Sequence, residues 1–296
     1  MARTPVVYDH LAALEKFTPR TIEHPLTGCK SHYLGDPKAK TLLVYLHGGG
    51  YVMPATPAHL KYLYKLVKDV NASAGSDTAF AVLVLSYNLV PEVAWPKPLA
   101  QASDCLNYLI DKEGRDPKTI MIGGDSAGGN LALALISHLL HPHPDASVPR
   151  TTGLHSPLGS ALVISPWVEL ANDKRKSKQS CLYTDVSAPN SSKGWAEVIL
   201  KNRSSDNYIE CVNAGADWWR GLEKVVEHTL VWGGGGEVLI DAIKVVMDDM
   251  KTASPDSVEI SIGHKMCHEQ MVVNTMLGYG KGESEHLVEN WIQAKL

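Results

Sequence analysis

The sequence predicts an α/β fold in which helices cover both faces of a mostly parallel central sheet. Short apolar runs alternate along the chain with longer segments whose apolar residues recur at helical spacing. The short runs are almost continuously apolar, as expected for strands that are buried on both faces. A long polar segment, rich in Ser, Asn, Lys and Trp, interrupts the alternation after residue 170. An insertion of this kind is more often a lid than a plain loop.

The expected elements follow from this alternation. Strands are expected at residues 41–46, 79–87, 119–124, 160–165, 228–233 and 257–263, and helices at 59–70, 98–112, 128–140 and 237–250. A chain of 296 residues is long enough to bury a sizeable core, so we expect one domain over residues 1–296. We assign about residues 1–20 and 171–221 to a small helical cap over the carboxyl edge of the sheet.

Composition and charge exclude several classes of function. The formal net charge is -4 and "NDKRKSKQS" is the one basic cluster, so we expect no nucleic-acid partner. The N-terminal segment lacks the apolar core of a signal peptide, and no segment approaches the roughly 20 apolar residues that span a bilayer. We therefore expect a soluble, cytoplasmic protein without stable membrane insertion. The five scattered cysteines fit a reducing compartment and suggest no zinc site. The oligomeric state stays open between a monomer and a homodimer.

The segment "TIMIGGDSAGGN" places Ser126 at the centre of a G-x-S-x-G sequence between an expected strand and an expected helix. A serine on such a tight turn has a strained backbone and an exposed hydroxyl, and its small neighbours let strand and helix pack closely. The strand and helix on either side favour a nucleophile over an ordinary glycine-rich turn.

A nucleophilic serine needs a histidine base and a carboxylate that orients the base, and in this architecture both follow the serine in the chain. "GGGGEVLIDAI" offers Glu237 in the loop after a strand and Asp241 one helical turn later. We favour Glu237, because an acid in the first helical turn often serves the helix dipole alone. "HKMCHEQM" offers His264 and His268, and we favour His268 because it follows a short loop with room to turn back towards the serine.

The stretch "YLHGGGYV" places three consecutive glycines at the end of an expected strand. Attack by a serine on a carbonyl creates an oxyanion, which needs backbone N–H groups aimed at one point with no side chain in the way. We expect Gly49, Gly50 and the N–H of Ala127 to form this oxyanion hole. His47 is then expected to fix the loop rather than to act as a base.

These motifs resemble those of the hormone-sensitive-lipase-like branch of the α/β-hydrolases, which includes arylacetamide deacetylases, bacterial carboxylesterases and fungal steryl acetyl hydrolases. The resemblance rests on "HGGGYV", "SYNLVPE", "GDSAGGN", "SPWVEL", "GGGGEVLIDAI" and "CHEQM", which lie between residues 45 and 271. "SPWVEL" and "ADWWRGL" look closest to fungal members.

The resemblance implies an α/β-hydrolase fold with serine esterase or deacetylase activity on short-chain carboxylic esters, without a metal or cofactor. The family's triad maps onto Ser126, Glu237 and His268. Two departures stand out. The acid is usually Asp and here is Glu, whose extra methylene requires a different loop path. "SYNLVPE" also lacks the arginine of the family's more usual pattern.

Three functions remain open on the sequence. The first is hydrolysis of a small-molecule ester. The second is non-catalytic ligand binding, as in receptors of this family that have lost the triad histidine; the presence of both an acid and a histidine disfavours it. The third is a triad reaction other than hydrolysis on a secondary metabolite. The natural substrate depends on the pocket walls, where the candidate residues are Tyr51, Trp167, Trp195, Trp218 and Trp219.

Overall fold

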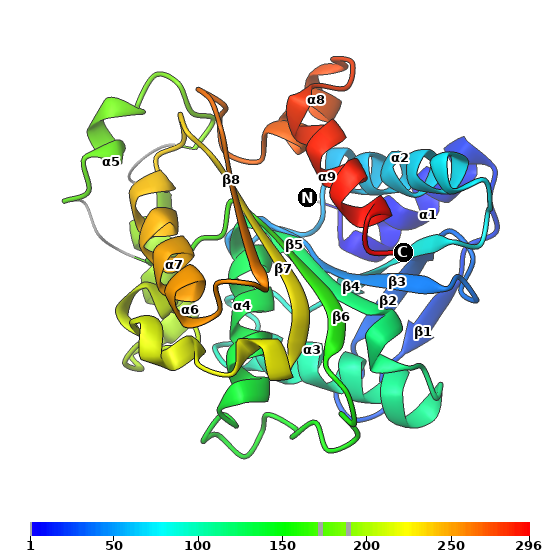
Figure 1. The fold of residues 1–296 in the computed structure, drawn as a ribbon, viewed down its shortest axis with the longest axis horizontal. Helices are drawn as coiled ribbons and strands as arrows, with labels where there is room; N and C mark the ends of the chain where they lie inside the picture. Colours follow the sequence, from blue (N-terminus) through cyan, green and yellow to red (C-terminus); the bar gives the residue numbers. More distant parts are fainter. Residues whose placement is uncertain (1, 171–173, 188–190) are drawn as a thin grey trace.

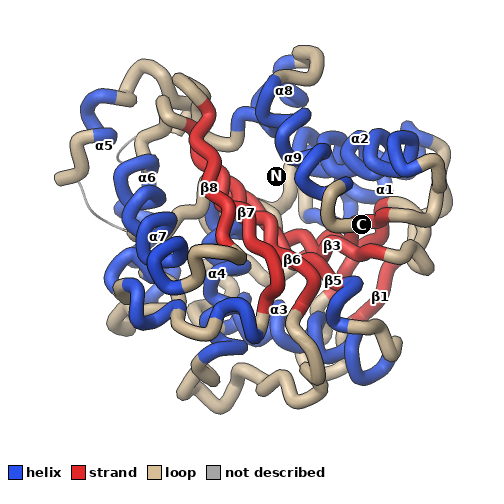
Figure 2. Tube along the Cα trace, in the orientation of Figure 1, coloured by secondary structure: helices blue, strands red, loops and turns tan. Residues whose placement is uncertain are grey.

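A twisted eight-stranded sheet runs through the molecule with helices on both of its faces (Figures 1 and 2). The computed structural model describes residues 2–170, 174–187 and 191–296. The strands are β1 (Thr21–Glu23), β2 (Lys30–Leu34), β3 (Thr41–Leu46), β4 (Phe80–Ser86), β5 (Ile120–Asp125), β6 (Leu158–Ile164), β7 (Val226–Gly234) and β8 (Val258–Gly263). Their order in the sheet is β1-β2-β4-β3-β5-β6-β7-β8.

Six of the strands form one parallel unit. β4, β3, β5, β6, β7 and β8 pair in parallel, whereas β2 runs antiparallel to both β1 and β4. The carboxyl ends of the parallel strands therefore lie along one edge of the sheet, where the following loops meet. The predicted α/β fold with a mostly parallel sheet is confirmed.

Helices from distant parts of the chain cover the sheet (Figure 1). They are α1 (Thr4–Glu15), α2 (Pro57–Ala74), α3 (Lys97–Asn107), α4 (Ser126–Leu140), α5 (Ser177–Ser180), α6 (Ser191–Leu200), α7 (Ile240–Ala253), α8 (Gln270–Leu277) and α9 (Glu283–Gln293). α2 packs against α1, α8 and α9 on one face, and α3 packs against α4 on the other.

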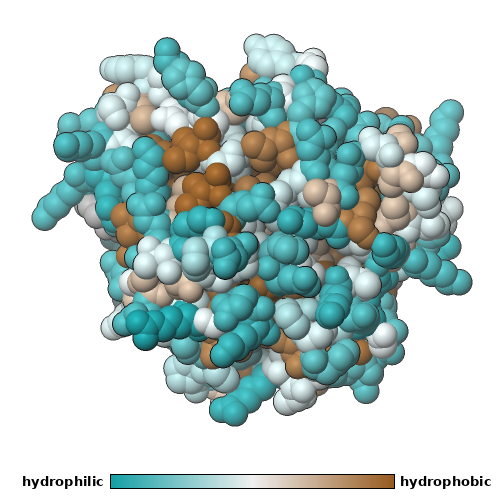
Figure 3. Space-filling view, in the orientation of Figure 1, coloured by the Kyte–Doolittle hydropathy of each residue, from teal (hydrophilic) through white to brown (hydrophobic). Residues whose placement is uncertain are grey.

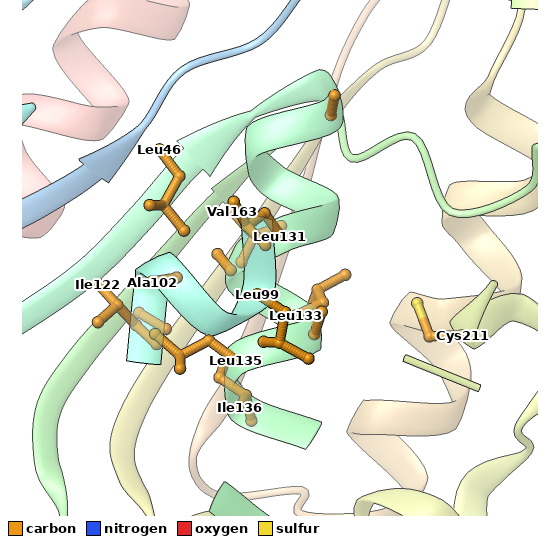
Figure 4. Close-up of a cluster of buried hydrophobic side chains, with 14 of the residues drawn as sticks. Leu46, Leu99, Ala102, Ile122, Leu131, Leu133, Leu135, Ile136, Val163 and Cys211 are labelled. Atoms are coloured by element: carbon orange, nitrogen blue, oxygen red, sulfur yellow. The ribbon is translucent and has the colours of Figure 1, made fainter. Parts of the chain in front are cut away.

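The fully buried strand β3 shows how the sheet divides the core in two. Leu42, Val44 and Leu46 point into the cluster that α3, α4 and α7 cover, whereas Leu43 and Tyr45 point into the cluster beneath α2. This alternation follows from the two-residue period of a strand, and it explains why the run "TLLVYL" has no polar face. Figure 4 shows the first cluster, with Leu46, Ile122 and Val163 of the sheet facing leucines of α3 and α4.

Sequence reasoning missed β1 and β2 because neither has an apolar run. β2 reads "KSHYL", and its buried Ser31 and His32 are polar residues with hydrogen-bond partners. The Oγ of Ser31 lies 2.6 Å from Nε2 of His24, and Nδ1 of His32 lies 2.9 Å from the hydroxyl of Thr21. Each of these side chains thus has one hydrogen-bond partner, and the polar half of β2 is buried next to the apolar Tyr33 and Leu34.

The face seen in Figure 3 is mostly polar, with apolar patches between the polar side chains. Some apolar exposure belongs to the edge strand β8, where Ile260 and Ile262 are exposed. No helix within the described ranges is both long enough and apolar enough to cross a membrane.

Candidate active site

Ser126 is the first residue of α4 and directly follows β5, at the carboxyl edge of the sheet. Its φ is +50°, in the left-handed region that side-chain-bearing residues rarely adopt. The glycines around it leave no room for a side chain. A Cβ on Gly128 would lie 1.9 Å from the carbonyl oxygen of Leu46, and one on Gly124 would lie 2.3 Å from the same oxygen. The sequence G-x-S-x-G thus reflects direct backbone contact between α4 and the end of β3.

The structure brings Ser126, His268 and Glu237 together. Nε2 of His268 lies 2.9 Å from Oγ of Ser126, and Nδ1 lies 2.5 Å from Oε2 of Glu237. The other oxygen of Glu237 accepts the main-chain N–H of Gly234 at 2.8 Å. Because a carboxylate can only accept, Nδ1 carries a proton, and in the neutral ring Nε2 is left to accept from the serine hydroxyl. Glu237 is fully buried, so its carboxylate stays in one orientation.

The electrostatic surroundings of His268 favour its charged form. Burial on its own lowers the pKa of the imidazole, but the charge of Glu269 and the hydrogen bond and charge of Glu237 raise it above its usual value. These carboxyl groups therefore stabilise the imidazolium form of His268 relative to the neutral ring.

The two alternatives that the sequence left open lie elsewhere. The carboxylate of Asp241 accepts the main-chain N–H of Ser177 at 2.8 Å, so it holds the segment at α5. His264 lies in the exposed turn after β8. Neither residue has a recorded contact with Ser126 or His268 among the described residues.

Asp185 is a site residue that sequence reasoning missed. Its Oδ1 accepts the main-chain N–H of His268 and its Oδ2 accepts that of Val238, both at 2.8 Å. The neighbouring Thr184 donates its hydroxyl to the carbonyl of Gly236 at 2.8 Å. The polar insertion therefore ties together the loop that carries Glu237 and the loop that carries His268. No local pattern in the sequence marks Asp185, because its partners are more than fifty residues away along the chain.

We expect Asp185→Ala to lower kcat for an ester substrate by about 10- to 100-fold with little change in KM, since small misplacements of a base have effects of this size. The control is Asp217→Ala, which removes an exposed carboxylate from the same insertion. Steady-state kinetics on both variants, with circular dichroism to establish folding, test the expectation. A folded Asp185 variant with the kcat of the unaltered protein would contradict it.

The glycine loop after β3 adopts a backbone that needs glycine. Gly49 has φ +106° and Gly50 has φ +61°, and a Cβ on Gly50 would lie 2.3 Å from the ring of Trp195. His47 is buried, donates from Nδ1 to the carbonyl of Gly48 at 2.8 Å, and stacks on Tyr87. Burial lowers the pKa of His47 to about 4, so its ring is neutral.

The main chain of Ala127, the third residue predicted for the oxyanion hole, lies in the first turn of α4 directly after Ser126. Residue Tyr51 ties the glycine loop to this helix, because its hydroxyl donates to Oδ1 of Asn130 at 2.7 Å. The structure therefore fixes the loop and the first turns of α4 relative to each other.

The predicted aromatic pocket residues fall into two groups. Trp167 donates its main-chain N–H to the carbonyl of Ser126 at 2.9 Å, and its ring meets that of Trp195 edge to face. Trp218 lies away from the serine, because its Nε1 donates to Oγ of Ser137 near the far end of α4. Trp219 is fully buried in the core.

The parallel sheet and the serine at the turn between β5 and α4 are the features of an α/β-hydrolase. In agreement, a family model for the α/β-hydrolase fold matches residues 43–272. The chain belongs to this family. LipR of Mycobacterium tuberculosis, an acetyl-hydrolase by its assigned name, is 30% identical over 73% of this chain and 61% of its own length. Arylacetamide deacetylase of Oryctolagus cuniculus is 28% identical over 58% of this chain and 42% of its own length. The chain thus spans about two fifths to three fifths of the length of these relatives.

Solved structures share the fold. A bacterial esterase of the hormone-sensitive lipase family superposes with a TM-score of 0.72 at 21% identity, covering 97% of this chain and 87% of that chain. Carboxyl esterase 2 of the fungus Tuber melanosporum superposes with a TM-score of 0.72 at 17% identity, covering 94% of this chain and 86% of that one.

Proposed function

We propose that this chain is a serine-dependent carboxylic ester hydrolase that acts on short-chain esters of a bulky small molecule. The contact of Ser126 with His268, and of His268 with Glu237, is the observation that carries the proposal. Relatives named as acetyl-hydrolase and arylacetamide deacetylase support the same reaction class.

In the proposed reaction, Oγ of Ser126 attacks the ester carbonyl carbon while Nε2 of His268 takes the hydroxyl proton. The carbonyl oxygen becomes an oxyanion, for which we propose the N–H groups of Gly49, Gly50 and Ala127 as donors. Collapse of the tetrahedral intermediate expels the alcohol, which receives the proton from His268. Water then attacks the acyl-serine by the same route, with His268 as its base, and releases the acid.

Glu237 has two roles in this scheme. It accepts the Nδ1 proton of His268, which holds the tautomer whose Nε2 can act as base, and it stabilises the imidazolium that forms. The main-chain N–H of Gly234 holds its second oxygen and fixes the orientation of the carboxylate.

We also propose that residues 171–221 act as a cap over this site, together with about residues 1–20. Asp185 contacts both loops of the proposed triad, and the ring of Trp195 packs against Gly50, which supports a position over the glycine loop. Residues 171–173 and 188–190 of this proposed cap lie outside the described residues. The helix α1 in the first twenty residues packs against α2 and contributes Tyr8 and Leu11 to the core.

A screen of p-nitrophenyl esters of graded acyl length tests the proposed function. We expect turnover to be highest between acetyl and roughly hexanoyl esters, because each buried methylene contributes only about 0.8 kcal/mol until a closed pocket runs out of room. Rates should fall for longer chains. Faster turnover of palmitoyl than of butanoyl esters would contradict a closed pocket, and absence of turnover on every ester would contradict the hydrolase itself.

A further inference from the structure

A second group of ionisable side chains lies directly beside the proposed triad. It consists of His59 from α2, Asp125 immediately before Ser126, and Glu269 immediately after His268; the polar atoms of the three come within 4.8 Å of one another. Nε2 of His59 donates to Oδ2 of Asp125 at 3.0 Å, and the carboxyl group of Glu269 hydrogen bonds to Asp125. The reaction described above uses none of these three side chains.

Two hydrogen-bonded carboxyl groups require a proton between them, because a carboxylate has no donor. The surroundings of Asp125 favour its ionised form: besides the bond from His59, the hydroxyl of Tyr45 donates to Oδ1 at 2.6 Å. Although burial opposes ionisation, the charge and hydrogen bond of His59 hold the pKa of Asp125 well below its usual value. Burial, and then the charge of Asp125, raise the pKa of Glu269. Asp125 therefore stays ionised, and Glu269 is the acid of the two whose charge changes with pH in the range in which a histidine base titrates.

The pair of carboxyl groups is packed against the glycine loop. A Cβ on Gly48 would lie 2.1 Å from Oδ2 of Asp125 and 2.6 Å from Oε1 of Glu269. The first glycine of the loop thus makes the space that the two acids occupy. With 14% of its side chain exposed, Glu269 has little access to water that could screen its charge.

Glu269 faces the nitrogen of His268 on which the proposed reaction depends. Its Oε1 lies 3.4 Å from Nε2 of His268, the atom that is 2.9 Å from Oγ of Ser126. An ionised Glu269 would attract a proton to Nε2, and a protonated Nε2 cannot accept from the serine. A neutral Glu269 leaves this nitrogen free. The charge of Glu269 consequently competes with the base function of His268.

We propose that Glu269 is a positioning residue that acts through His268: the proton it shares with Asp125 controls its charge, and that charge sets the pH above which Nε2 of His268 can accept the proton of Ser126. The proposal rests on the proposed ester hydrolysis. The titratable groups around Glu269 and His268 come from six other parts of the fold and are Glu237, Asp185, Asp125, His59, Tyr45 and Tyr87.

The first test compares the pH dependence of kcat/KM for a short-chain, uncharged ester in the unaltered protein and in Glu269→Gln. Glutamine keeps the shape of the side chain and removes its charge. Because loss of a neighbouring negative charge lowers the pKa of a histidine, we expect the midpoint of the acid limb to move down by about one pH unit. Activity should then persist at a pH where the unaltered protein has lost it.

The second test uses Asp125→Asn, which removes the charge that keeps Glu269 protonated. Glu269 should then ionise more readily, so the midpoint of the acid limb should move up by about one pH unit and kcat/KM on the acid limb should fall about tenfold. In the double variant, Glu269→Gln should return the midpoint to that of the Glu269→Gln single variant. A structural defect at Asp125 would not be reversed in this way.

Glu285→Gln is the matched control, because Glu285 is a buried glutamate on α9 that bonds Asn274 instead of the histidine. Its midpoint should equal that of the unaltered protein. A midpoint in Glu269→Gln within about 0.3 pH units of the unaltered protein would overturn the proposal, given that one pH unit corresponds to an interaction of about 1.4 kcal/mol. Loss of activity on dialysis against EDTA would also overturn it, since the three side chains would then hold an ion instead of a shared proton.

An NMR titration of the His268 imidazole, assigned by comparison with His268→Ala, gives the same midpoints without turnover. If the unaltered protein hydrolyses no ester, the proposed function fails, while the NMR shifts between variants still test the coupling of Glu269 to His268.

Discussion

Replacing Ser126 with alanine should leave a folded protein whose kcat/KM for short-chain esters is lower by at least about a thousandfold, because the nucleophile, base and acid act as one unit. The substitution removes only the hydroxyl that meets Nε2 of His268 at 2.9 Å. Alanine also avoids adding volume next to Gly124 and Gly128, where backbones are in contact. The measurement is kcat/KM on one p-nitrophenyl ester, with circular dichroism as the check on folding.

The matched control for this variant is Ser137→Ala, a buried serine on the same helix whose Oγ accepts from Trp218 instead of facing the histidine. Its turnover should stay within a few-fold of the unaltered protein. A phosphonate ester should label Ser126 in the unaltered protein and in the control. Retained turnover in Ser126→Ala, or labelling at a different serine, would end the esterase proposal in its present form.

Glu237→Gln and His268→Ala should each lower turnover by several orders of magnitude. The amide of glutamine offers Nδ1 a donor as well as an acceptor, which favours the wrong tautomer of the imidazole, and loss of this tautomer costs about 10⁴ in kcat in other Ser-His-acid sites. His268→Ala should also abolish the rise of activity with pH that a histidine base produces. The measurement is kcat/KM against pH for both variants.

Asp241→Asn and His264→Ala are the matched controls for this pair. Asp241 holds Ser177, so its loss should cost stability near α5 but little turnover. His264 is exposed and its loss should leave the pH profile unchanged. Near-normal rates in Glu237→Gln or His268→Ala would overturn that assignment. Near-normal rates in both would revive ligand binding or another triad chemistry as the function.

The fold was predictable because its strands and helices differ clearly in their apolar pattern. β3 is apolar from Leu42 to Leu46 because successive residues face two different cores, and residues of β5 and β6 likewise alternate between the two cores. β1 and β2 could not be found in this way, since the burial of Ser31 depends on a hydrogen bond to His24 that no periodicity records.

The candidate site was predictable only where chain order constrains it. Ser126, Glu237 and His268 each follow one of the parallel strands closely, so an argument from strand ends brings them to one edge of the sheet. Their catalytic roles stay predictions. Asp185 comes from the polar insertion, and its two contacts with distant main-chain N–H groups leave no trace in local sequence. Glu269 was visible beside His268 in the chain, but its approach to Asp125 depends on the left-handed backbone at residue 269.

The contact between Gly128 and the carbonyl of Leu46 has a consequence for how the site can change over evolution. Leu46 ends β3 directly before the glycine loop, and Gly128 lies in the same helical turn as Ser126. Main-chain atoms have no rotamers, so no rearrangement of side chains can alter the spacing between loop and serine. New substrate preferences must therefore arise from side chains around this backbone contact, such as that of Trp195. The contact between Gly128 and Leu46 itself leaves no room for gradual change, because any side chain at residue 128 would disrupt it.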